Sequence, residues 1–157
     1  MERLITVVPL ELAMIALCFW KPRAGRIVFG FFFLAMALGV NVPLTLTNVD
    51  SYGVYGSNAF FGLYRWAFRE IVALNPMFWA VLLIVYETSV GLLMLSRNRS
   101  VQLGVIGGIL FVLVITPLGI ETLGNPLLAV AMGLLLRQRY DQSVVEMLRG
   151  WRLAHAH

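Results

Sequence analysis

The sequence has little charge for its length, and what charge it has is scattered. Only 13% of the 157 residues are charged, against about 25% in an average soluble protein, while 60% are hydrophobic and the mean hydropathy is +0.84. This composition predicts a chain that lies in a lipid bilayer. The basic residues stand between apolar runs and form no single patch, so we expect no nucleic-acid partner.

Cysteine and histidine are also scarce, which narrows the possible chemistry. Cys18 is the only cysteine, so the chain has no intramolecular disulfide and no paired-cysteine redox motif. The two histidines, His155 and His157, stand at the C-terminal end and leave no imidazole in an apolar run to bind haem. The sequence contains no nucleophile elbow, metal-ligand cluster, dinucleotide fingerprint or phosphate loop. We therefore expect no metal and no covalently bound cofactor.

Long apolar runs make up most of the remaining sequence. A helix needs roughly 20 apolar residues to span the hydrocarbon core. Four runs are close to that length, namely residues 4–20, 27–46, 77–96 and 101–116. A fifth, residues 127–136, is short but can be extended to Tyr140. The start lacks the features of a cleaved signal peptide, so the first run is read as a retained helix. The sequence thus predicts an all-α, polytopic transmembrane bundle over residues 1–140.

The order of basic residues predicts the orientation of this bundle. Short basic turns, residues 21–26 and 97–100, separate the runs. Five crossings place nine lysines and arginines on one side and three on the other, whereas four crossings give five against seven. The positive-inside rule favours five crossings, with the N-terminus outside and the C-terminus in the cytoplasm. In the tail, residues 141–157, the spacing of Val144, Leu148 and Trp151 predicts an amphipathic helix on the cytoplasmic membrane surface.

The only sizeable segment outside the predicted spans is residues 47–76, expected on the outer side. Within it, residues 59–74 interleave aromatic and aliphatic residues with charge, which predicts an interfacial helix. Arg65 and Arg69 share a face of that helix and could hold an anionic headgroup or substrate. A solvated basic face is the plainer interpretation, and we favour it.

Carboxyl groups inside the apolar runs are the strongest functional candidates. Glu87 lies in the middle of its run, where a charged carboxylate costs a few kcal/mol. It is either a proton-exchanging or ligand-binding group or a neutral hydrogen-bonding one, and both interpretations stay open. Glu11 lies about seven residues, or roughly 10 Å, from the outer end of its helix. Asn41 falls at a similar depth and could donate to Glu11, and we favour such a polar clamp over catalysis.

Residues 26–35 and 87–96 carry glycine-containing apolar sequences, RIVFGFFFLA and ETSVGLLMLS, that resemble segments of DoxX-like membrane proteins. Residues 26–35, with the sequence RIVFGFFFLA, look like the opening helix of that family. Residues 87–96, ETSVGLLMLS, are similar to its second helix, and Glu87 falls on its recurrent acidic position. The resemblance covers residues 26–139 and implies four core helices, to which residues 4–20 add an N-terminal helix. It further implies a small subunit of a bacterial inner membrane that associates with quinone-linked oxidoreductases, including those of thiosulfate oxidation, or with oxidative-stress complexes.

Three functions are compatible with these features. The first is an accessory or anchor subunit that binds a lipophilic small molecule, a quinone being the candidate, and works with a soluble oxidoreductase subunit or a second copy of itself. The second is a stand-alone enzyme for lipids or isoprenoids, with Glu87 and Glu11 as acid and base. The third is a small proton-coupled transporter. The ligand-binding candidates are Glu87, Glu11, Asn41, Arg65 and Arg69, and the sequence identifies no catalytic residue.

Overall fold

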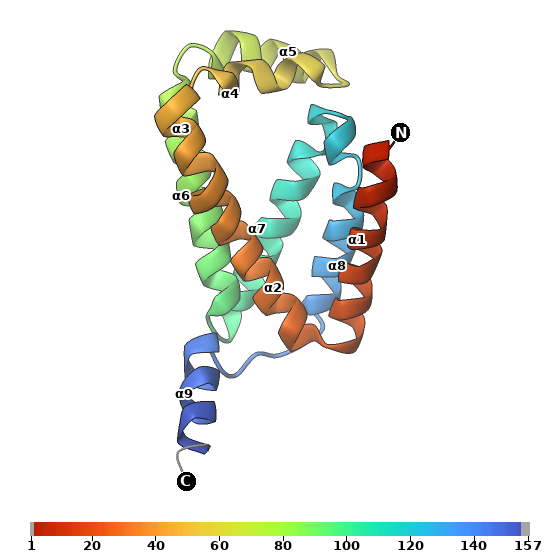
Figure 1. Cartoon of the computed structure of the whole chain (residues 1–157), viewed down its shortest axis with the longest axis vertical. Helices are drawn as coiled ribbons and strands as arrows, with labels where there is room; N and C mark the ends of the chain where they lie inside the picture. Colours follow the sequence, from red (N-terminus) through yellow and green to blue (C-terminus); the bar gives the residue numbers. More distant parts are fainter. Residues whose placement is uncertain (1, 155–157) are drawn as a thin grey trace.

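The computed structural model describes residues 2–154, and its regular structure is helical throughout that range (Figure 1). The main helices of the bundle are α1 (Glu2–Trp20), α2 (Pro22–Ala35), α6 (Pro76–Leu95), α7 (Arg99–Ile115) and α8 (Asn125–Leu135). The shorter elements are η1 (Met36–Asn41), α3 (Val42–Asn48), α4 (Ser51–Val54), η2 (Tyr55–Asn58), α5 (Gly62–Ala67), η3 (Phe68–Val72), η4 (Thr116–Leu118), η5 (Ile120–Thr122) and α9 (Val144–Ala154). The prediction of an all-α chain is confirmed.

Three helical segments are long and apolar enough to cross a bilayer. They are Pro22–Asn48, which joins α2, η1 and α3, Pro76–Leu95, which is α6, and Arg99–Leu118, which joins α7 and η4. Among the residues whose side chains the structure describes, α1 and α8 contribute the shorter apolar helices Pro9–Trp20 and Asn125–Leu135. These lengths are compatible with a membrane protein, and the crossing of α1 and α8 stays a prediction.

Helix boundaries correct the predicted basic turns. The first turn contains only Lys21, because α2 begins at Pro22, whose fixed φ and missing N–H suit the first position of a helix. Arg26 is therefore inside α2. The second turn is also tighter than expected, since α7 begins at Arg99. Asn98 makes this turn with a positive φ of 54° and a ψ of −131°, a backbone conformation that is uncommon for residues other than glycine.

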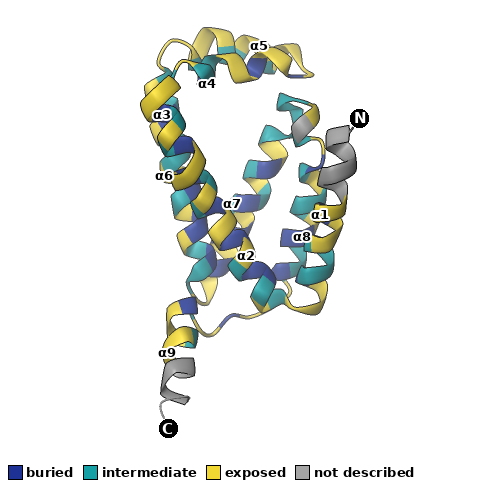
Figure 2. Cartoon of the chain, viewed as in Figure 1, coloured by how far each residue is buried: buried dark blue, intermediate teal, exposed yellow. Residues whose placement is uncertain are grey.

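The bundle core forms where the helices pack side by side. α2 packs on α6, α6 on α7, α7 on α8 and α8 on α1. Buried side chains from these helices meet inside, including Phe29, Phe33, Met94 and Met132. Figure 2 shows buried positions turned toward the interior and exposed positions on the outside of the bundle. Many of the exposed side chains are large and apolar, as expected for helices that face lipid.

Glycines on α7 permit its close approach to neighbouring helices. A methyl group built on Gly104 would lie 2.8 Å from the backbone nitrogen of Met94 on α6. On Gly108 it would meet Met94 and Met132 at under 3.0 Å. The absence of a side chain at these two glycines therefore lets α7 pack closely on α6 and α8.

The two ends of the bundle are capped differently. Helices α4 and α5 lie across one end, here termed the α5 end (Figure 1). The helical stretch Gly62–Ala67 and Phe68–Val72 confirms a helix within the predicted residues 59–74. This stretch docks on the end of α7 through the Tyr64 hydroxyl, which donates to the carbonyl of Val114 at 2.9 Å.

The opposite end, termed the α9 end, contains the α1–α2 and α6–α7 turns and the C-terminal helix. α9 confirms a helix in the tail, and in Figure 1 it points away from the bundle. Ser143 and Glu146 form a capping box at its start: the Ser143 N–H donates to Glu146 Oε2 at 2.7 Å, and the Glu146 N–H donates to Ser143 Oγ at 3.2 Å. Arg97 in the α6–α7 turn binds Glu146 Oε1 at 3.0 Å. The side chain of Trp151, His155 and His157 lie outside the described residues.

Candidate functional site

Glu87 lies on the inner face of α6 and is almost fully buried, with 2% of its surface exposed. Its partner is Asn41, the last residue of η1, whose Nδ2 donates to Glu87 Oε2 at 2.6 Å. An amide is a neutral donor, and no described cation forms an ion pair with Glu87. The carboxyl group is therefore held in the bundle by a hydrogen bond without a neutralising charge.

Two hydroxyl groups extend this pair toward the α5 end. The Tyr52 hydroxyl on α4 lies 3.0 Å from Asn41 Oδ1, to which it donates, and 3.3 Å from Thr45 Oγ1. The Thr45 hydroxyl donates to the backbone carbonyl of Asn41 at 2.7 Å. All four residues are buried. We call Glu87, Asn41, Tyr52 and Thr45 the Glu87 cluster.

A π-helical turn places Asn41 against α6. In η1 the chain makes wider turns than in an α-helix, as the hydrogen bond from the Val42 N–H to the Ala37 carbonyl shows. Pro43 follows directly and has no N–H to donate, so regular α-helical bonding cannot continue through this point. The extra residue in the turn rotates the following residues about the helix axis. Single π-helical turns of this kind are frequent at functional sites.

Glu11 is buried elsewhere, in the contact between α1 and α8. It is 3% exposed, and a methyl group on Gly124 would clash with its carboxyl group. Its Oε2 has no hydrogen-bond partner among the described residues. The expectation that Asn41 donates to Glu11 is wrong, because α1 packs on α8 while η1 packs on α6, which gives Asn41 to Glu87.

The two arginines of the α5 end are engaged within their own segment. Arg65 Nη1 donates to the carbonyl of Ala59 at 2.6 Å. Arg69 pairs with its neighbour Glu70 at 2.7 Å, and both side chains are largely exposed. These contacts fit a solvated charged surface and do not bring Arg65 and Arg69 together on one anion.

Tyr52 and Thr45 were not among the predicted site residues. Thr45 follows Asn41 by four residues, so a helical reading could have placed both on one face. Tyr52 gave no such signal, because it lies on a separate short helix whose return to the bundle depends on the fold. Among the described residues, no group of three histidine, cysteine or acidic side chains is arranged to hold a metal ion.

Comparisons with protein-family models, with curated proteins and with solved structures found no match to this chain. The resemblance of residues 26–139 to DoxX-like proteins therefore rests on the sequence features alone. The function has to be argued from the geometry of the Glu87 cluster and from its place in the bundle.

Proposed function

We propose that the chain is a membrane-embedded accessory or anchor subunit that binds a lipophilic small molecule with hydrogen-bonding oxygens at the Glu87 cluster, a quinone being the leading candidate. The observation that carries the proposal is the buried 2.6 Å hydrogen bond from Asn41 to Glu87, which joins the apolar helical segments Pro22–Asn48 and Pro76–Leu95. Ionisable groups inside membrane helices are costly and are therefore a mark of ligand or proton pathways. The resemblance to DoxX-like proteins supports the choice of a quinone.

The groups of the cluster suit the head group of such a molecule. Quinone carbonyls accept hydrogen bonds, which the Tyr52 hydroxyl or a protonated Glu87 can donate. Reduction of a quinone to a quinol takes up two electrons and two protons, and Glu87 can exchange protons but not electrons. The electrons must come from a redox partner, and a soluble oxidoreductase subunit docked on the membrane is the class we propose.

The other two functions have less support from the geometry. An enzyme using Glu87 and Glu11 as acid and base needs both carboxyl groups on one substrate, whereas Glu87 packs toward η1 and Glu11 toward α8. A transporter needs a pathway on both sides of Glu87. Turnover by the isolated chain would favour the enzyme, and proton-coupled flux in liposomes would favour the transporter.

The proposal is tested by measuring the quinone and lipid content of the gently solubilised protein by mass spectrometry. We expect about one quinone per chain in the wild type and loss of most of it in Glu87→Gln, which keeps the shape and an acceptor for Asn41. Tyr86→Phe is the matched control. Tyr86 directly precedes Glu87 on α6, but its hydroxyl donates to the Gly107 carbonyl on α7 at 2.9 Å. Equal, non-stoichiometric content in all three proteins would contradict the proposal.

A further inference from the structure

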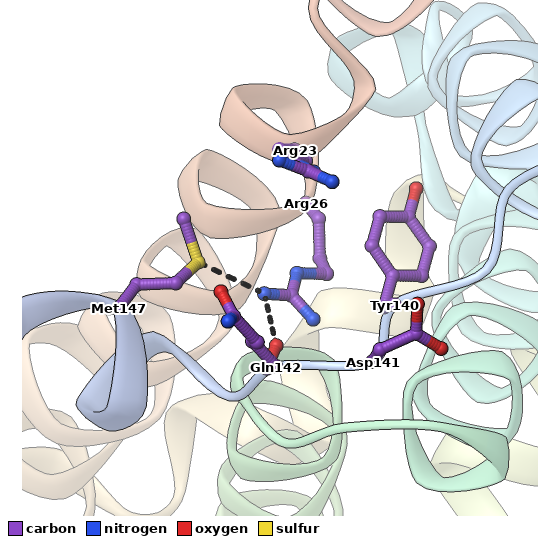
Figure 3. Close-up of a pocket in the computed structure, with 6 residues that line it drawn as sticks. All are labelled: Arg23, Arg26, Tyr140, Asp141, Gln142 and Met147. Carbon is purple, nitrogen blue, oxygen red and sulfur yellow. Dashed lines mark hydrogen bonds between the residues drawn. The ribbon is translucent and has the colours of Figure 1, made fainter. Parts of the chain in front are cut away.

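A cavity lined by polar side chains lies at the α9 end of the bundle, and none of its lining residues belongs to the Glu87 cluster. Its volume is about 250 Å³, several times the ~30 Å³ that one water occupies in the liquid. Figure 3 shows its lining side chains, which come from the first turns of α2, from the linker before α9 and from α9 itself. They are Arg23, Arg26, Tyr140, Asp141, Gln142 and Met147.

Arg26 forms the wall of this cavity and is 1% exposed. Its Nη1 donates to the carbonyl of Ser96 at 3.0 Å and its Nη2 to the carbonyl of Gln142 at 3.2 Å. The guanidinium carbon lies 4.6 Å from the centre of the Tyr140 ring, a cation–π distance. Burial raises the pKa of Tyr140 to about 12, so this ring is a neutral phenol at physiological pH.

Among the residues that the structure describes, no acidic side chain forms an ion pair with Arg26. Two carbonyls, the Met147 sulfur at 3.8 Å from Nη2 and a neutral ring contact it, and its buried Nε has no hydrogen-bond partner among the described residues. Asp141 lines the same cavity but forms no ion pair with Arg26 or Arg23. A buried charge with neutral partners is costly, and an anion that entered the cavity would reduce the cost.

Further features add positive potential at the same place. Arg23 lines the cavity one helical turn before Arg26. It lies in the first turn of α2, where the Lys21 side chain provides no cap, so helical N–H groups remain available to an anion. Arginine is the side chain best suited to phosphate, because its planar fork can donate two parallel hydrogen bonds.

The cavity also lies where a lipid headgroup would be in a bundle that crosses a membrane. Phe19 and Trp20, at the end of α1 just before the turn, are 66% and 76% exposed, as expected of aromatic residues at a membrane interface. Farther along α2, Val28 and Phe31 expose apolar surface against which acyl chains can lie. We propose that this cavity binds the phosphate group of an anionic phospholipid through Arg23 and Arg26.

The test is a binding titration of the purified full chain, reconstituted in nanodiscs of zwitterionic phosphatidylcholine that contain increasing fractions of phosphatidylglycerol, read by native mass spectrometry. We expect phosphatidylglycerol to be retained preferentially. Arg23→Gln should weaken retention about fivefold, the factor for ~1 kcal/mol per arginine at a lipid surface. Arg26→Gln should weaken it more, but it also removes the bonds to Ser96 and Gln142, so Arg23→Gln is the decisive variant.

Arg99→Gln is the matched control, because Arg99 is an exposed arginine at the same end that does not line the cavity. It should leave retention unchanged. The proposal is overturned if both lipids are retained equally, or if Arg99→Gln lowers retention as much as Arg23→Gln does. A parallel titration with inorganic phosphate, read in the same way, distinguishes the source of the phosphate group. Binding of inorganic phosphate to the wild type that is lost in Arg23→Gln supports the same site with a soluble ligand.

Discussion

At the level of single residues, Glu87 depends on one side-chain donor. The Asn41 side chain donates to Oε2 of the Glu87 carboxyl group on α6 and also accepts from the Tyr52 hydroxyl on α4, so it joins these two groups in one hydrogen-bonded chain. Burying a carboxyl group without this donor costs more than the hydrogen bond itself gains, because the group then loses its water without replacement.

The first prediction concerns this pair. Asn41→Leu should lower the free energy of unfolding by about 1–3 kcal/mol, because it leaves the Glu87 carboxyl without its donor. The double variant Asn41→Leu, Glu87→Leu should recover most of the loss, since both polar groups are then replaced by apolar ones of similar size. The measurement is unfolding by SDS titration in mixed micelles, followed by circular dichroism.

The backbone carbonyl of residue 41 still accepts from Thr45 in these variants, so the local helix is retained. Additive losses in the single and double variants would contradict a direct interaction between Asn41 and Glu87.

The polar residues inside the apolar runs were predictable from the sequence, but their partners were not. Glu87, Glu11 and Asn41 were recognised as polar groups inside apolar runs, and all three are buried. Their partners were not predictable, because a helix can rotate and tilt without any change in its hydropathy. Arg26 was assigned to a turn and is instead a buried cation within α2.

At the level of elements, glycine spacing controls how closely α7 approaches α6. Gly104→Ala should lower the free energy of unfolding by about 1–3 kcal/mol, because the new methyl group would lie 2.8 Å from the backbone nitrogen of Met94 and the helices must separate. Gly133→Ala on α8 is the control, since no atom lies within 4 Å of the methyl position.

The control variant should keep its stability or gain up to ~1 kcal/mol from the better helix propensity of alanine. Equal losses for Gly104→Ala and Gly133→Ala in the same SDS titration would show that contact with Met94 is unimportant.

The capping box of α9 predicts a pH dependence at the α9 end. Hydrogen bonds from Ser143, first from its N–H and then from its hydroxyl, lower the pKa of Glu146 below its ordinary value of 4.5. A carboxyl group with a lowered pKa stabilises the folded helix fully at pH values above its ordinary pKa of 4.5. This stabilisation is lost as the pH falls through the lowered pKa. α9 should therefore fray progressively as the pH falls below 4.5.

Hydrogen exchange of the α9 amides, corrected for intrinsic rates, measures this fraying. Glu146→Gln should abolish the pH dependence while keeping a capping side chain. Asp50→Asn, at the α5 end, should leave the dependence intact. Identical pH profiles for wild type and Glu146→Gln would exclude Glu146 as the responsible group.

At the scale of the whole molecule, the distribution of basic residues predicts that the two ends of the bundle face opposite sides of a membrane. Ser57→Cys at the α5 end and Arg99→Cys at the α9 end place exposed thiols for an impermeant maleimide. In intact cells we expect labelling of Ser57→Cys only, and in inverted vesicles of Arg99→Cys only. The native Cys18 is 2% exposed and should stay unlabelled.

Labelling of both variants from the same side would contradict the predicted topology. The three long helical segments place the two ends on opposite sides whether or not α1 and α8 cross, so this labelling tests the orientation of the bundle.

Composition and apolar run length by themselves determined the helical class of this protein and the approximate extent of its long helices, because hydropathy and helix length are local properties that add along the chain. They also identified Glu87 as a carboxyl group in the middle of an apolar run. Only the tertiary structure decided that Asn41 serves Glu87 and not Glu11, that Tyr52 returns to complete the cluster, and that Arg26 lines a cavity. These contacts depend on the rotation given by the π-helical turn and on which helices pack together, and neither is encoded in any single run of residues.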